Sequence, residues 1–116
     1  LVAQARLLGW KATAEARPDV VAGLAAALSW LDAIVVMGHD VEPSSRCLMA
    51  ALDSDAGYIG ALGAPAMQQA RADWLAYRDV TDLSRVNGPA GLAIGSQGPA
   101  EIAVSIVAQI IAVARL

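Results

Sequence analysis

The chain has 116 residues, of which 57% are hydrophobic and 16% charged. This composition excludes a disordered chain, and the length fits one domain over residues 1–116 that buries a core without disulfides. The net charge of −3 offers no basic surface for nucleic acid. Cys47 is the only cysteine, and the N-terminus lacks the features of a signal peptide, so we expect a cytoplasmic protein.

The longest apolar run, residues 102–116, has to be tested against a membrane. Spanning a bilayer takes about 20 predominantly apolar residues. The run is shorter than that, it contains Ser105 and Gln109, and Arg115 lies near its end. We therefore predict a buried helix and no membrane partner.

The first third of the chain predicts two helices around an extended segment. Residues 1–8 have apolar side chains at helical spacing, and Gly9 can end that helix. Residues 11–16 could then run extended, and Arg17-Pro18 breaks this segment. Residues 20–31 are rich in alanine and leucine, which favours a second helix.

The middle of the chain repeats a strand, a turn and a helix. Residues 33–37 are a continuous apolar run typical of a strand covered on both faces. After the Gly38-His39-Asp40 turn, Pro43 suits a first helical turn, and the helix continues to Asp53. Residues 58–63 predict a second buried strand.

A helix over residues 65–78 follows, and its expected apolar face consists of Met67, Ala70, Trp74 and Tyr77. Strands that alternate with helices in this way require right-handed crossovers and a parallel sheet. The fold class is therefore α/β, a three-layer Rossmann-like domain. We expect it to be incomplete at its N-terminus, because the glycine-rich phosphate turn of such folds would precede Leu1.

The last part predicts a turn, a loop and a long helix. Residues 82–86 fit a short helical turn, and residues 87–95 are too glycine-rich for a helix, so they predict a loop with a short strand. Gly98 is placed to cap the final helix. Glu101, Ser105 and Gln109 recur every four residues and form one polar stripe; we expect most of the remaining circumference to be buried.

Candidate binding residues lie where strands end, because ligands of open α/β sheets bind outside the carboxyl ends of the strands. His39 could donate to a ligand or exchange a proton, and Asp40 could cap the next helix through its side chain. The structural alternative is that His39 packs over the loop and Asp40 only caps. Gly63 permits close approach of either a ligand or a helix.

Two further segments could contact a ligand. Asn87, Gly91 and Gly95 lie in a loop whose backbone donors could cradle an anion, or which could be a tight turn. Glu15 stands where NAD(P)-binding folds place the acid that bonds the ribose, although it could equally be a solvated partner of Arg17. No catalytic motif is present, and one histidine with one cysteine cannot form the usual zinc site.

The strand that ends in Gly38-His39-Asp40, the segment 58–63, and the segments 88–95 and 98–106 together resemble the XdhC/CoxI family. The resemblance is to the C-terminal Rossmann-like domain and extends over residues 32–116. Residues 1–18 are more loosely similar to the first helix and second strand of that domain.

The resemblance implies an accessory factor for xanthine dehydrogenase and related molybdenum hydroxylases, not an enzyme. Such factors bind the molybdenum cofactor while a cysteine desulfurase provides its sulfur, and they deliver it to the apoenzyme. The implied partners are therefore an apo molybdenum hydroxylase and a cysteine desulfurase. The alternatives are an NAD(P)-binding domain of an oxidoreductase and a non-catalytic assembly module that forms a homo-oligomer.

This chain departs from the family at four polar positions. The family usually has threonine in place of Gly38, a Ser-Arg-like pair in place of Ala64-Pro65, histidine in place of Asn87 and aspartate in place of Ala93. The segment between Pro18 and Asp32 is also too short for the third strand and helix of the family.

Overall fold

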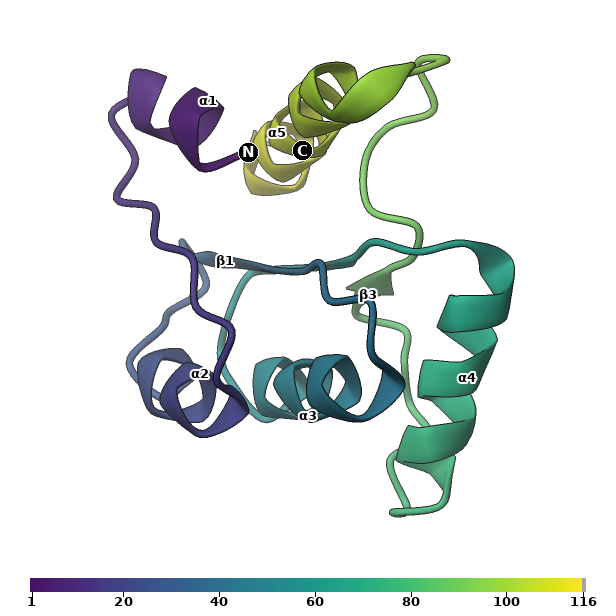
Figure 1. The fold of residues 1–116 in the computed structure, drawn as a ribbon. Helices are drawn as coiled ribbons and strands as arrows, with labels where there is room; N and C mark the ends of the chain where they lie inside the picture. The colour runs from purple at the N-terminus through teal and green to yellow at the C-terminus, as the bar shows by residue number, and fades with distance from the viewer. Residues whose placement is uncertain (116) are drawn as a thin grey trace.

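The computed structural model describes residues 1–115, which form an α/β domain in three layers (Figure 1). Helices α1 and α5 cover one face of a parallel sheet, and α2 and α3 cover the other. Helix α4 packs against α3 beside the sheet. The elements are α1 (Val2–Leu7), α2 (Pro18–Ala25), β1 (Ala33–Val36), α3 (Val41–Leu52), β2 (Tyr58–Ala61), α4 (Pro65–Ala76), β3 (Val86–Asn87) and α5 (Gly98–Arg115). The predicted α/β class with a parallel sheet is confirmed.

The sheet has the strand order β1-β2-β3 and both pairings are parallel. Ala33 of β1 lies opposite Tyr58 of β2, and Gly60 of β2 lies opposite Asn87 of β3. Because all three strands run the same way, their carboxyl ends and the turns after them lie at one edge of the sheet.

The core lies between the sheet, α3 and α4. Its buried members are Val36, Leu48, Ala51, Ala56, Ile59 and Leu75. Leu75 is completely buried and Ile59 is 1% exposed, and burial of each such side chain stabilises the fold by about 2 kcal/mol. This core fixes β1 and β2, and with them the turns at their ends.

The segment 11–16 leads from α1 to α2 and joins no strand of the sheet. One prediction for the first third of the chain is wrong. Helix α2 ends at Ala25 and not at residue 31, because Ser29 and Asp32 form a local turn. The Ser29 N–H donates to the Asp32 carboxylate at 2.8 Å, and the Asp32 N–H donates to the Ser29 carbonyl at 2.9 Å. Such side-chain bonds compete with helix continuation.

The predicted apolar face of α4 is also wrong. Its buried residues are Arg71 and Leu75, whereas Tyr77 is 88% exposed. The spacing of apolar residues predicts the wrong buried face of α4, because Arg71 lies at the centre of the face that is buried. The predicted turn over residues 82–86 is a single turn, in which the Val86 N–H donates to the Leu83 carbonyl at 3.0 Å, and it leads directly into β3.

Helix α5 begins at Gly98 itself; Ser105 and Gln109 of its polar stripe face the protein, whereas Glu101 is exposed. Ser105 is 3% exposed, and the Tyr58 hydroxyl donates to the Gln109 side-chain oxygen at 2.5 Å. Burial raises the pKa of Tyr58 to about 12, so the hydroxyl keeps its proton. The expectation that most of the helix is buried is wrong: Val104 is 52% and Val113 47% exposed.

By length and composition alone, the helix Gly98–Arg115 is also apolar enough to cross a membrane. Its mean hydropathy is 1.4, and 22% of its residues are buried within the protein. The helix is longer than the apolar run 102–116 because it includes the glycine-proline start. Core helices of soluble proteins pass the same test. Its buried Ser105 and its bond from Tyr58 join it to the sheet.

Candidate functional site

The turn after β1 is fully open to solvent. Gly38, His39 and Asp40 are all exposed. Asp40 is the N-cap of α3, but its side chain makes no capping bond; instead its backbone carbonyl accepts from the Ser44 hydroxyl at 2.6 Å. The side-chain cap expected of Asp40 is therefore absent, and both side chains of the turn face water.

A buried arginine holds this turn against the next one. Arg71 of α4 is 1% exposed. Its Nη2 donates to the Gly38 carbonyl at 2.8 Å, and its Nη1 donates to the Leu62 carbonyl at 2.6 Å. Its Nε donates to the Ser44 hydroxyl at 3.0 Å. One side chain thus joins the ends of β1 and β2 to the start of α3.

Gly63 fits this arrangement because it lacks a side chain. Its φ is +140°, a conformation that favours glycine, and a Cβ there would lie 2.9 Å from Met67 Cγ and 3.3 Å from Arg71 Nη1. Gly63 is exposed, so the guanidinium lies close beneath the surface here.

The turn after β3 borders a hollow of about 350 Å³ at the same edge of the sheet. The hollow is lined by Pro65, Gln68, Gln69, Gly88 and Pro89. The Gln68 side-chain amide donates to the Ala61 carbonyl at 2.8 Å and so fixes one wall. The start of α4 and the end of β3 therefore form a shallow recess beside Gly63.

Two of the three candidate residues near the end of β3 and in the loop after it, Asn87 and Gly91, have hydrogen-bond partners within the protein. The Asn87 side chain donates to the Ile59 carbonyl at 3.0 Å. The Gly91 N–H donates to the Gln109 side-chain oxygen at 2.8 Å, and a Cβ on Gly91 would lie 2.3 Å from Ser105 Oγ. Gly95 has a φ of +73° with open space around it. Asn87 and Gly91 thus have intramolecular partners, and the backbone of Gly95 is accessible.

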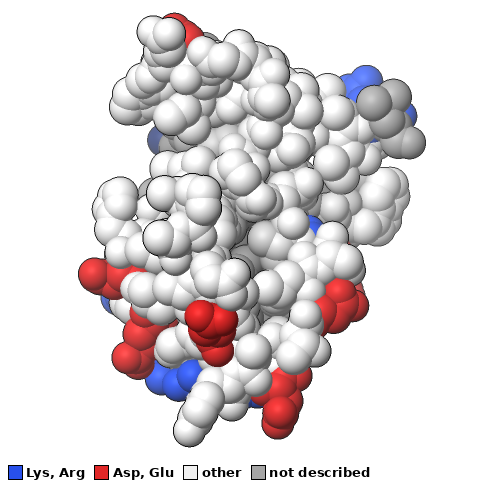
Figure 2. Space-filling view, turned by 90° about the vertical axis from the view of Figure 1, so that its right-hand side faces the viewer, with Lys and Arg blue, Asp and Glu red and all other residues white. Residues whose placement is uncertain are grey.

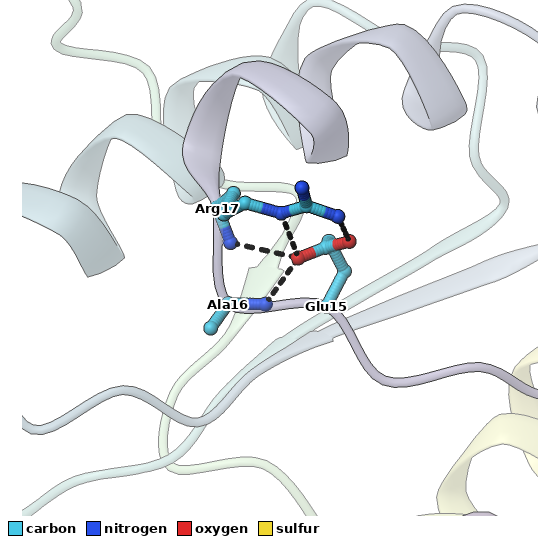
Figure 3. A network of polar contacts seen from close by, with 3 residues as sticks. All are labelled: Glu15, Ala16 and Arg17. Carbon is cyan, nitrogen blue, oxygen red and sulfur yellow. Dashed lines mark hydrogen bonds and ion pairs between the residues drawn. The ribbon is translucent and has the colours of Figure 1, made fainter.

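Glu15 lies outside this group, in the linker that descends from α1 to α2 on the left of Figure 1. Its carboxylate accepts the backbone N–H groups of Ala16 and Arg17, and also the Arg17 Nε and Nη2, the last at 2.8 Å (Figure 3). Arg17 holds the pKa of Glu15 at about 2. The carboxylate has four local donors, and binding a ribose would require some of them to be displaced.

Two other features lie away from this edge. A larger open groove of about 1160 Å³ lies between α2, α3 and the loop that contains Asp79 and Arg85. Arg85 donates to the carbonyls of Leu52, Ser54 and Ala56 just before β2, and hence at the opposite end of the strands. Within residues 1–115, no three His, Cys, Asp or Glu side chains are grouped to hold a metal ion.

Arg71 therefore joins two of the predicted segments, the turn with His39 and Asp40 and the turn with Gly63. Asn87 lies one strand further along the same sheet, and its side chain is used within the sheet. Sequence reasoning missed Arg71. The only available signal was its position four residues before Leu75, on a face that a soluble helix usually keeps apolar.

Comparisons with known proteins agree with this fold. The family described as the XdhC Rossmann domain matches residues 1–110. Six chains of solved structures match. One of them, described as a xanthine dehydrogenase from Bacillus halodurans, is 34% identical with a TM-score of 0.60, and the match covers 76% of this chain and 25% of that one. No curated protein matches. The chain thus spans about a quarter of that protein's length, and it belongs to the XdhC family as its Rossmann-like domain.

Proposed function

We propose that this domain belongs to an accessory factor that holds the molybdenum cofactor during its sulfuration and its insertion into a xanthine dehydrogenase-type enzyme. Membership of the XdhC family supports an accessory role in the maturation of such enzymes. The proposed partners are the apoenzyme and a cysteine desulfurase, in the cytoplasm. The proposal assigns binding residues to this chain and no catalytic residue.

The observation that carries the proposal is the exposed turn with His39 and Asp40, fixed from beneath by Arg71. The molybdenum cofactor combines a pterin, which offers hydrogen-bonding edges, with an anionic phosphate. His39 and Asp40 supply a donor and an acceptor in solvent, and the buried guanidinium supplies positive charge. The residues at this edge therefore suit both parts of the cofactor.

Titrating the full-length protein with the molybdenum cofactor, followed by absorbance, tests the proposal. We expect saturable binding, and His39→Ala should weaken it by about tenfold, the effect of losing one hydrogen bond to a charged group. Because His39 is exposed, its loss should leave the thermal midpoint unchanged. Tyr77→Ala, at an exposed position on the far end of α4, is the matched control and should bind normally. An absence of binding in the unmodified protein would refute the function.

A second candidate function, assembly into a homo-oligomer, is supported by the outer face of α5. Val104 and Ile111, which are seven residues apart and hence on one face, are 52% and 37% exposed. Seen from the side of α4, the region of α5 and of the loop before it has few charged side chains, whereas charged groups gather over the lower half (Figure 2). An apolar surface of this kind is usually covered.

Sedimentation of the full-length protein tests this second candidate. The unmodified protein should sediment as a dimer or larger, and Val104→Glu should shift it toward the monomer. Tyr77→Glu, on α4, introduces the same charge elsewhere and should leave the mass unchanged. A monomer at micromolar concentration would contradict assembly through α5.

A further inference from the structure

The charge of Arg71 has no counter-ion among the described residues. The ion pairs within residues 1–115 join Arg17 to Glu15 and Arg46 to Glu42, and neither involves Arg71. Its three partners are neutral oxygens. Burying a charge is costly, and neutral donors could serve these three oxygens without that cost. Hydrogen bonding therefore explains the donors at this position but not their positive charge.

The place of the charge suggests what it does. Arg71 Nη2 bonds the Gly38 carbonyl, and Nη1 lies 3.3 Å from where a Cβ on Gly63 would be. Both glycines are exposed and neither has a side chain. The guanidinium thus lies beneath the backbone of Gly38 and Gly63. Little water would separate its positive charge from a ligand group bound above these two glycines.

The turn with Gly38, His39 and Asp40 and the turn with Gly63 together form the strand-end site. We infer that Arg71 makes this site selective for a negatively charged group of its ligand, such as a phosphate ester. Arg71 acts from beneath, as a positioning residue that fixes both turns, and does not itself touch the ligand. The inference deepens the proposed function and rests on the same site.

The carboxylates that follow the Gly38 turn in sequence do not cancel this charge. Glu42, in the first turn of α3, accepts from Arg46 at 3.1 Å, so it is already paired. Asp40 is exposed and has no side-chain partner in the cap. Its charge acts through water and is screened, whereas that of Arg71 acts through protein.

A matched pair of probes tests the inference: 6-hydroxymethylpterin and its diphosphate ester, titrated into the full-length protein by pterin fluorescence. The unmodified protein should prefer the ester by at least about tenfold. Arg71→Met should reduce the preference by about tenfold. Arg71→Lys keeps the charge but loses the planar fork, so it should weaken both probes and keep the preference within about twofold.

Arg85→Met is the matched control, because it removes another arginine that bonds backbone carbonyls, three of them, at the opposite end of the strands. It should lower stability and leave the preference unchanged. If Arg71→Met does not fold, Arg71→Gln, which keeps a donor but removes the charge, takes its place and should reduce the preference to the same extent. No preference in the unmodified protein, or an equal preference in Arg71→Met, would overturn the inference. Cofactor binding without any preference for the ester would overturn this inference but leave the proposed function intact. A preference for the ester without cofactor binding would refute the proposed function but support the inference.

Discussion

Replacing Gly91 with alanine is expected to lower the free energy of unfolding by about 3 kcal/mol. A Cβ at this position would lie 2.3 Å from Ser105 Oγ and 3.4 Å from the backbone nitrogen of Ile106. The φ of +107° is strained for any residue with a side chain. The Ser105 hydroxyl could rotate away, but only by giving up its 2.7 Å bond to the Ile102 carbonyl. Urea unfolding followed by circular dichroism measures the loss.

Gly95→Ala is the control for this prediction. Its φ of +73° imposes a similar backbone strain, but a Cβ there meets open space. It should therefore cost only about 1 kcal/mol. If the two variants were equally stable, the loop would not pack against α5 as described, and a ligand-binding use of Gly91 would regain support.

Gln109→Leu should lower stability by about 3 kcal/mol, because two buried groups lose their acceptor. The Gln109 side-chain oxygen accepts both the Tyr58 hydroxyl and the Gly91 N–H, the latter at 2.8 Å. Leucine has a similar volume but no acceptor. Chemical unfolding of the single variant gives the loss directly.

A double-mutant cycle with Tyr58→Phe separates the two bonds. Tyr58→Phe alone should cost about 1 kcal/mol, because one neutral hydrogen bond is lost. In the Gln109→Leu background it should cost almost nothing, since the hydroxyl already has no partner. Strictly additive effects would contradict the contact between β2 and α5.

The unit of strand, turn and helix around residues 33–53 could be predicted from the sequence for local reasons. A continuous β-branched run has few alternatives to a buried strand. Pro43 then restricts where α3 can start, and the helix begins two residues earlier, at Val41. The exposed turn with His39 follows from these two constraints, so its place at the carboxyl end of β1 was predictable.

The role of Arg71 could not be predicted, because it depends on contacts 27 and 33 residues away along the chain. Sequence periodicity treats an arginine as a surface residue, and only the fold brings the two strand-end carbonyls to its guanidinium. That Ser105 and Gln109 of α5 face the protein could not be predicted either, because it too depends on contacts distant in the sequence. A glutamine such as Gln109 indicates a solvated face of the helix until the fold brings Tyr58 and Gly91 to its side-chain oxygen.

The most direct test of the central claim, that the strand-end turn binds the cofactor, is the modification of His39 by diethylpyrocarbonate in the full-length protein. His39 is exposed, so the free protein should react quickly at this residue, as measured by mass spectrometry of its peptide. We expect saturating molybdenum cofactor to slow the reaction at least about tenfold, while the exposed Lys11, between α1 and α2, reacts unchanged. Equal reaction rates with the cofactor demonstrably bound would place the binding site elsewhere and contradict the account.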